Sequence, residues 1–442
     1  MVRKMAQKTF EKFFEKLEGE NKENNFKQTE IGLIPEDWEV VRLGEVAYFE
    51  TGKRMKGGAL KSGEVFSIGG EHITDEGNIK FEPLKFVSKD FYLRMKKGKI
   101  KIGDILICKD GAKTGKTALV KYLPYQYCAV NEHVFIVRSK NTNQLINQFL
   151  FFFIYSRYGQ TQIRDAFHGL IGGITQRELF NLLIPLPPLP EQRKIVSVLD
   201  KIQQAIELQD RIIEQAKRLK KSLMQKLFTE GLYGEEQKET EIGLIPKSWE
   251  VVRLEEIGKI ITGNTPSKRK KEYWENGEID FIKPPDLKNS YITTFSEKIS
   301  LKAKDKARIV PEKSILVSCI GIIGRVGYTL KPVAFNQQIN AIIPFSDKID
   351  SLFLFFALQT QVKQIESMKS ATTVPIVNKA KFSHVKIPLP SLEEQKQIAH
   401  ILSTIDRKIE VEQKRKQVLK ELFKTMLHKL MSGEIRLKVV EI

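Results

Sequence analysis

A segment rich in glycine and lysine is the strongest candidate for chemistry in this sequence. Residues 110–117 read Asp-Gly-Ala-Lys-Thr-Gly-Lys-Thr and follow an apolar run that is typical of a strand. A phosphate-binding P-loop needs the pattern G-x-x-x-x-G-K-[ST], but only three residues separate Gly111 from Gly115. We therefore predict no nucleotide hydrolysis. The segment is either a basic loop whose Lys113 and Lys116 touch DNA phosphates or an ordinary surface turn.

No other group of residues predicts catalysis. The six histidines lack metal-ligand spacing, and the three cysteines form no Cys-x-x-Cys pair. No glycine-rich dinucleotide fingerprint occurs. The segment Lys283-Pro-Pro-Asp286 has a lysine where an amino-methyltransferase needs a hydrogen-bond acceptor, so it is better explained as extended chain. The sequence thus predicts no catalytic residue, no metal site and no cofactor.

Two polar tripeptides stand at equivalent places before a predicted strand. They are Asn131-Glu-His133 and Asn336-Gln-Gln338. Asparagine and glutamine can each form two hydrogen bonds with adenine. We take Asn131, His133, Asn336, Gln337 and Gln338 as candidate DNA contacts. The alternative, that these side chains cap a turn, is equally open.

The net charge of the chain favours a polyanionic partner. Lys and Arg total 73 against 54 Asp and Glu, which gives a net charge of +19 and a pI near 9.5. Nucleic acid is the leading candidate, because binding of phosphates releases counterions. A membrane surface is the alternative, but no apolar run approaches a spanning length. The N-terminus lacks the apolar core of a secretory signal, and we expect a cytoplasmic protein. Further candidate phosphate contacts are Lys53, Arg54, Lys56 and Lys268.

The segments that would position these candidate residues are repeated along the chain. Residues 29–46 return as residues 240–257 with fourteen of eighteen positions identical, at an offset of 211. Residues 184–192 return as 387–395 at an offset of 203. A period near 200 is too long for a solenoid and indicates two homologous domains. The predicted segments are an N-terminal helix and loop (1–28), a first domain (29–190), a helix and linker (191–239), a second domain (240–390) and a last helix (391–442).

Each domain shows mixed α/β character. Predicted strands at residues 105–108 and 134–137 precede a predicted helix at 144–157 in the first domain. The order repeats in the second domain, with strands at 314–317 and 339–343 and a helix at 351–366. We therefore predict two loop-rich domains of related fold.

Two long helices follow the domains. Each has about 40 residues, or roughly 60 Å at 1.5 Å per residue. The first begins after Pro190, and the second begins with a predicted capping box of Ser391 and Glu394. A helix of this length with one apolar stripe needs a partner, and we predict an antiparallel coiled-coil pair, although each helix could instead pack on its own domain. The predicted seam residues are Ile195, Leu199, Ile202, Ile206, Ile398, Leu402, Ile405 and Ile409.

The two repeated motifs together resemble a known family. T-E-I-G-x-I-P-x-x-W-x-x-x-x-L opens each domain and I-P-L-P-x-L-x-E-Q begins each long helix. This combination resembles the DNA-specificity (S) subunit of type I restriction-modification systems. The segment Thr262-Gly-Asn-Thr-Pro-Ser267 matches that family's T-G-x-T-P-S loop near DNA, which adds Asn264, Thr265 and Ser267 as candidates. The first copy keeps only Thr51-Gly52 of this loop.

The resemblance implies a division of labour. It implies that each domain binds one half of a bipartite duplex DNA site, while the helices set the spacing and dock two methyltransferase (M) subunits. Motor-nuclease (R) subunits would join the larger complex, and S-adenosylmethionine would bind to the M subunits. Two alternatives come from other classes, namely a self-contained restriction and modification enzyme and a scaffold that binds only protein. The missing catalytic motifs argue against the first and the basic charge against the second.

Overall fold

The chain forms two compact units that share both long helices. The computed structural model describes residues 25–167, 173–370 and 373–437. One unit comprises the residues up to Leu208 together with those from Lys416 onward, and the other spans Gln209–Arg415. Each long helix therefore contributes one half to each unit. The predicted segments instead gave each long helix a segment of its own.

The first unit contains two main sheets. Its elements are β1 (Phe26–Thr29), β2 (Gly32–Pro35), β3 (Glu39–Arg42), α2 (Leu43–Val46), β4 (Ala47–Thr51), β5 (Val65–Ile68), β6 (Phe86–Val87), α3 (Lys89–Arg94), β7 (Ile105–Cys108), β8 (Thr117–Leu119), β9 (Tyr127–Val130), β10 (Val134–Ser139), α4 (Asn147–Tyr155), α5 (Arg157–Asp165), α6 (Gln176–Asn181) and β11 (Leu183–Leu186). One sheet has the order β4-β10-β7-β8 and the other β6-β5-β9. Strand β3 pairs with β11, and β1 with β2.

The N-terminal prediction is only partly within the described residues. The predicted helix around residues 10–17 lies outside them. Residues 26–28, predicted as the end of a loop, form β1 together with Thr29 instead, because they pair with β2 in an antiparallel hairpin.

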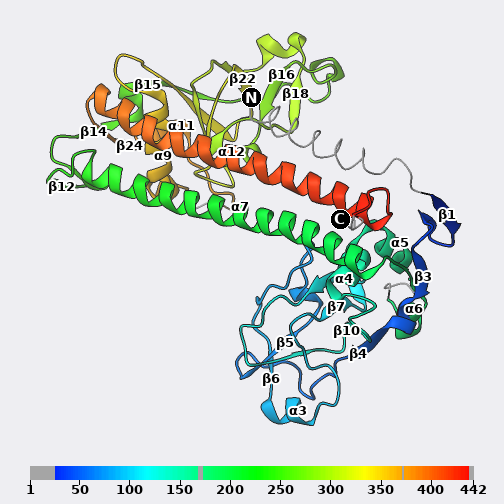
Figure 1. Cartoon of the computed structure of the whole chain (residues 1–442). Helices are drawn as coiled ribbons and strands as arrows, with labels where there is room; N and C mark the ends of the chain where they lie inside the picture. Colours follow the sequence, from blue (N-terminus) through cyan, green and yellow to red (C-terminus); the bar gives the residue numbers. More distant parts are fainter. Residues whose placement is uncertain (1–24, 168–172, 371–372, 438–442) are drawn as a thin grey trace, which may run out of the picture. The chain divides into compact units, whose positions relative to one another are not determined.

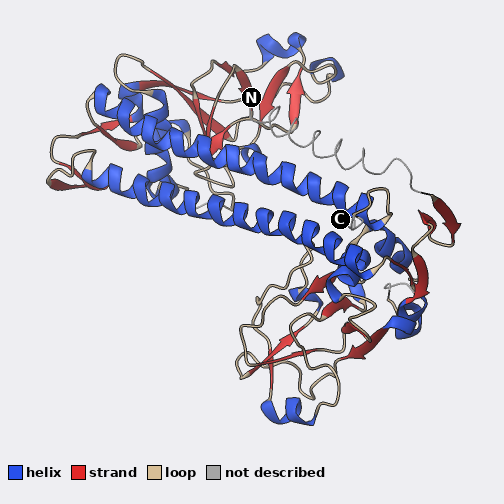
Figure 2. Cartoon of the chain, in the orientation of Figure 1, coloured by secondary structure: helices blue, strands red, loops and turns tan. Residues whose placement is uncertain are grey.

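The second unit repeats this arrangement. Its elements are β12 (Gln237–Thr240), β13 (Gly243–Pro246), β14 (Glu250–Arg253), α8 (Leu254–Ile257), β15 (Gly258–Thr262), β16 (Ile279–Ile282), β17 (Ser290–Tyr291), β18 (Glu297–Ile299), β19 (Ile309–Val310), β20 (Ile315–Ser318), β21 (Val326–Tyr328), β22 (Val333–Phe335), β23 (Ile339–Pro344), α9 (Ser351–Thr360), α10 (Val362–Ser367), α11 (Lys379–Ser383) and β24 (Lys386–Leu389). Its sheets have the orders β15-β23-β20-β21-β17 and β18-β16-β22-β19. Figure 2 shows that loops make up much of both units. The predicted mixed α/β class is confirmed.

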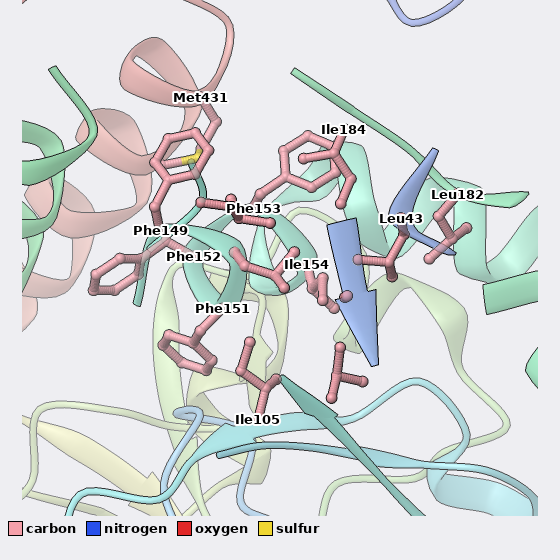
Figure 3. Close-up of a cluster of buried hydrophobic side chains, with 14 of the residues drawn as sticks. Leu43, Ile105, Phe149, Phe151, Phe152, Phe153, Ile154, Leu182, Ile184 and Met431 are labelled. Atoms are coloured by element: carbon pink, nitrogen blue, oxygen red, sulfur yellow. The ribbon is translucent and has the colours of Figure 1, made fainter. Parts of the chain in front are cut away.

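An apolar helix forms the centre of each core. In the first unit, α4 carries six consecutive buried residues, Phe149 to Ile154. Figure 3 shows this helix between Ile105 of strand β7 and Met431 at the end of the last long helix. Helix α9 does the same in the second unit with the buried residues Phe353 to Leu358. Burial on all sides explains why these segments lack the one-sided apolar pattern of a surface helix.

The two long helices pack against each other in opposite directions within each unit. They are α7 (Leu189–Glu230) and α12 (Leu392–Met431), shown in green and in orange to red in Figure 1. In the first unit, Leu199 of α7 shares a core with Met426 and Leu430 of α12. In the second unit, Leu402 of α12 shares a core with Leu227 and Phe228 of α7. The predicted antiparallel pair of long helices is therefore present.

The predicted seam residues have different surroundings. Ile195 and Leu199 belong to the core of the first unit, and Ile202 packs against it. Ile398 and Leu402 belong to the core of the second unit, while Ile405 and Ile409 join Ile213 and Ala216 in a small separate cluster. Ile206 is only partly buried. Each helix thus packs on a domain and on the other helix at once, which combines the two alternatives that the sequence left open.

A polar contact interrupts the apolar seam. Gln209 donates from Nε2 to Oε2 of Glu412 at 2.6 Å, and both residues are buried. A buried polar pair of this kind fixes the register of paired helices. Within the described ranges, no helix combines the length and apolar character that a membrane span requires.

Candidate nucleic-acid interface

The two duplicated motifs meet each other in space. The opening tryptophan Trp38 donates from Nε1 to Oε2 of Glu191 in the first turn of α7, at 3.1 Å. In the second copy, Trp249 donates in the same way to Glu394 of α12 at 3.0 Å. The predicted capping box is therefore only half made. Ser391 accepts from the Glu394 amide, but the Glu394 carboxylate turns to the tryptophan.

The glutamine that follows this glutamate connects the long helix to the domain core. Oε1 of Gln192 accepts from the backbone amide of Ile146, which precedes α4, at 3.0 Å. Oε1 of Gln395 accepts from the amide of Asp350, which precedes α9, at 2.8 Å. The Glu-Gln pair therefore fixes each long helix to the opening motif and to the central apolar helix of its domain.

The retained Thr-Gly pair positions a loop against the polar tripeptide. A Cβ atom on Gly52 would lie 1.8 Å from the carbonyl oxygen of Val130, and one on Gly263 would lie 2.2 Å from that of Asn336. Contacts this short exclude any side chain, so the two backbones can approach only because the residue is glycine. This close approach explains why the first copy keeps Gly52 after losing the rest of the loop motif.

In the second unit, the T-G-x-T-P-S loop is tied to its surroundings by side chains. The Thr265 hydroxyl donates to Oε1 of Gln337 at 2.6 Å. Nδ2 of Asn264 donates to the carbonyl of Lys306, and Oδ1 of Asn264 accepts from the amide of Arg308. The loop thus lies between two other loops, and Ser267 at its end and Lys268 after it are exposed.

The exposed Lys268, which follows this loop, is held by an aromatic ring and a carboxylate. Nζ of Lys268 lies 3.2 Å from the ring centroid of Trp274 and 2.6 Å from Oε2 of Glu297. Glu297 also accepts from Lys283. Burial alone would raise the pKa of Glu297, but the hydrogen bonds from the two lysines outweigh it and lower that pKa. The carboxylate therefore stays ionised and orients both lysines.

The equivalent loops of the first unit carry charged residues at their tips. Oδ1 of Asp110 accepts from Nδ1 of His133 at 2.7 Å. Oε1 of Glu132 lies 3.7 Å from Nε of Arg54, so the two residues form an ion pair without a hydrogen bond. Loops 51–56, 109–116 and 131–133 are therefore brought together as loops 262–270, 318–325 and 336–338 are in the second unit.

The remaining cations of the first unit have different surroundings. Lys53 and Lys56 are exposed. Lys116 forms an ion pair with Asp75, and its hydrogen bond lowers the pKa of that carboxyl group. Lys113 is partly exposed on the short turn after β7. The segment that follows β7 is thus a tight turn. No long helix follows it directly in the described chain, which agrees with the sequence pattern.

The two asparagines of the tripeptides have a structural role. Oδ1 of Asn131 accepts from the amide of His133 at 3.0 Å, and Oδ1 of Asn336 accepts from that of Gln338 at 3.1 Å. Asn336 is only 7% exposed. These side chains hold the turn, so the positions that follow them are better placed to contact a ligand.

Sequence reasoning missed several residues of these loops. Asp110 and Glu132 were not selected, because a search for phosphate contacts favours cations. Arg308 and Trp274 lie in segments without a motif, and only the structure brings them beside the loop at 262–268. Glu132 stands at the position that matches Gln337 in the repeat, and this match is the signal that could have identified Glu132.

Among the described residues, no group of three or more His, Cys, Asp or Glu side chains could hold a metal ion. What the loops present is a set of exposed cations beside amide, imidazole and carboxylate groups. Cations bind phosphates, and the other groups can read base edges in a groove.

Comparisons with known proteins agree with this arrangement. The family model of the type I restriction modification DNA specificity domain matches residues 35–218 and 246–421. The putative type I restriction enzyme MjaX specificity subunit of Methanocaldococcus jannaschii is 30% identical over 433 residues, which cover 94% of this chain and 98% of the relative. The MjaVIII specificity subunit of the same organism is also 30% identical, over 94% of this chain and 97% of the relative.

Solved structures show the same fold. The S subunit of a type I restriction-modification system from M. genitalium has a TM-score of 0.60 at 18% identity and covers 89% of this chain and 96% of that one. A chain from a type I R-M complex has a TM-score of 0.55 at 22% identity and covers 91% and 99% of the two chains. With two family matches that coincide with its two repeated domains, this chain belongs to the type I restriction-modification DNA-specificity family.

Proposed function

We propose that this chain reads the DNA sequence for a type I restriction-modification complex, with each unit contacting one half of a bipartite duplex site. The observation that carries the proposal is the pair of glycine-anchored loops. Gly52 and Gly263 hold the same backbone approach in both units, while the exposed or partly exposed tips differ, with Glu132 and His133 in one and Gln337 and Gln338 in the other. A common frame with different tips is what two different half-sites require.

The cations around the tips supply the sequence-independent part of binding. The candidates for phosphate contacts are Lys53, Arg54, Lys56, Lys113, Lys116, Lys268, Arg269 and Lys270. Phosphate contacts position a protein on the duplex, and base contacts select the sequence. The affinity for DNA should therefore fall steeply as the salt concentration rises.

The chemistry belongs to partner subunits in this proposal. Two methyltransferase subunits dock along α7 and α12 and supply S-adenosylmethionine-dependent methylation, and motor-nuclease subunits complete the complex. The relatives are named as specificity subunits of type I restriction enzymes, which supports this division. The complex acts on DNA in the cytoplasm.

The direct test is to map methylated adenines in cells that carry this chain with its partner subunits. We expect one bipartite site of two short half-sites separated by a fixed spacer. Replacing the residues 131–133 and 110–116 should change one half-site and leave the other intact. Methylation at a single continuous sequence, or purified chain that turns over S-adenosylmethionine by itself, would contradict the proposal.

The helices also have a testable role in spacing. A seven-residue insertion preserves the heptad phase and lengthens a helix by roughly 10 Å, which corresponds to about three base pairs of B-DNA. Matched insertions after Gln209 and Gln413 should lengthen the spacer and leave both half-sites unchanged. An unchanged spacer in an assembled, active complex would mean that the helices hold partners without measuring DNA.

A further inference from the structure

Two hairpins keep most of their residues in both units. β1–β2 and β12–β13 pair in the same register, with Thr29 opposite Gly32 and Thr240 opposite Gly243. Most of the identities have a reason inside the fold. Each threonine hydroxyl donates to the carbonyl of its glycine at 2.7 Å, and the glycines have φ values of +101° and +104°. The other residues with a visible internal role are buried or cap a helix, namely Ile34, Pro35, Trp38, Leu43, Glu45 and their counterparts.

One retained apolar residue has no such reason. Leu33 is 61% exposed and Leu244 is 50% exposed, and neither belongs to a hydrophobic core. Their cross-strand neighbours differ, because Gln28 lies opposite Leu33 and Glu239 lies opposite Leu244. The leucine has therefore been kept at a solvent-facing position where the residue beside it has changed. An apolar side chain kept twice in this setting indicates that the same partner covers it twice.

The chemistry of the hairpins favours a protein over DNA as that partner. The turn beside each leucine carries an exposed glutamate, Glu30 in one copy and Glu241, which is ion-paired with Lys386, in the other. A carboxylate repels phosphates, and a leucine offers them no hydrogen bond. An apolar anchor beside a negative charge fits a protein surface with a small apolar pocket and a basic rim.

We propose that Leu33 and Leu244 are equivalent anchor residues, each of which docks one methyltransferase subunit. This inference rests on the proposed function, which needs two copies of one protein on a single chain. One hairpin in each unit supplies two equal docking points. The contact is additional to any contact along the long helices.

The test uses Leu33→Asp, Leu244→Asp and the double variant in the full chain. Each is mixed with the methyltransferase subunit of the same system, and the bound copies are counted by native mass spectrometry. We expect two copies on the wild type, one on each single variant and none on the double variant at equal concentration. The affinity at a changed hairpin should fall at least about tenfold, since an aspartate replaces a buried leucine contact.

Two control variants match the exposure of the anchors. Leu93→Asp changes a residue that is 61% exposed in the first unit, and Leu330→Asp changes one that is 52% exposed in the second. Both should bind two copies. Circular dichroism should show the same folded signal for all five proteins, because the changed side chains face solvent.

The outcomes separate this inference from the proposed function. Two copies bound to the double variant would overturn the docking assignment and leave the proposed function intact. A wild-type chain that binds no methyltransferase subunit would overturn both. If the variants instead abolish dimerisation of the chain alone and keep two methyltransferase copies, the hairpins join two copies of this chain and the assignment is wrong.

Discussion

The two units are alike in the contacts that hold each unit together and different at the loop tips that we propose contact DNA. Trp38 with Glu191 and Trp249 with Glu394 form the same contact at nearly the same distance. At the loop tips, by contrast, Glu132 and His133 in the first unit stand in place of the neutral Gln337 and Gln338 in the second, and His133 also contacts Asp110. We call the contacts that both units share, such as the tryptophan–glutamate bond, the frame of each unit. The comparison teaches that these internal contacts fix the frame, while the loop tips are free to diverge.

The frame itself differs at one point. In the first unit, Arg436 from the segment after α12 donates to both oxygens of Glu191 at 2.8 Å and also binds Asp37. In the second unit, Glu394 accepts instead from the backbone amide of Leu232. The equivalent buried carboxylates thus differ in their partners: Glu191 accepts from an arginine and from the backbone amide of Leu437, whereas Glu394 accepts from the backbone amide of Leu232.

The largest expected effect concerns the shared part of the frame. Leu199 and Leu402 are equivalent, and both are 0% exposed. Replacing either with aspartate removes a packed side chain and buries a charge, which should cost about 5 kcal/mol or more of unfolding free energy in its unit. Urea unfolding combined with hydrogen exchange would show which unit loses protection.

Leu208→Asp is the matched control, because Leu208 lies on α7 and is 51% exposed. Equal losses from the two buried positions would confirm that the frames are equivalent. A tolerated change at either buried position would break the comparison.

The second prediction uses the point at which the frames differ. Arg436→Ala leaves Glu191 buried without its cation and should destabilise the first unit by about 3 kcal/mol, with the second unit unchanged. Adding Glu191→Gln should restore part of the lost unfolding free energy, since burying a neutral amide costs less free energy than burying a carboxylate. Unit-resolved hydrogen exchange measures both. The exposed Arg193→Ala serves as control, and equal destabilisation of the two units would refute the assignment.

The sequence predicted the frame much better than the site. Repetition of Trp38 at an offset of 211 and of Glu191 at 203 revealed two domains, two long helices and their order. It could not reveal that the tryptophan meets the glutamate, because this contact joins residues 153 positions apart. The division of α7 and α12 between the two units likewise depends on contacts between segments that are far apart in the chain, which a sequence pattern does not show.

The loop tips were less predictable because one residue type can serve either in base recognition or in turn formation. Asn336 fits base recognition and turn formation equally well from sequence, and its burial and its bond to the Gln338 amide are features that a sequence does not show. Asp110 was overlooked because its partner, His133, lies on a different loop.

The third prediction tests the common loop anchor. Alanine at Gly52 or Gly263 would bring Cβ to 1.8 Å or 2.2 Å from a carbonyl oxygen, so the loop must shift at a cost of about 1–3 kcal/mol. Each variant should lose binding at its own half-site and keep the other, as measured with DNA probes in which one half-site is scrambled. Gly173→Ala, whose Cβ would lie 3.8 Å from its nearest neighbour, is the control. Loss at both half-sites from one change would contradict independent reading.

The smallest expected effect is the most informative about the tips. Glu132 and Gln337 occupy equivalent positions, but a carboxylate only accepts hydrogen bonds, whereas an amide also donates. A glutamate at a base edge selects the amino group of cytosine or adenine, and a good contact discriminates by about 1–3 kcal/mol. Glu132→Gln should therefore change the preferred base at one position of one half-site by roughly tenfold, and Gln337→Glu should do so in the other half-site.

Methylation mapping over randomised half-sites measures this preference, and Lys53→Gln provides the contrast. Loss of a phosphate contact should weaken binding evenly across sequences and lower the salt slope by about one. Glu132→Gln should instead alter the ranking of sequences and leave the salt slope nearly unchanged, because no phosphate contact is removed. If Glu132→Gln only strengthens binding at every sequence, its carboxylate acts by repelling phosphates, and the difference between the two tips is one of charge rather than of base recognition.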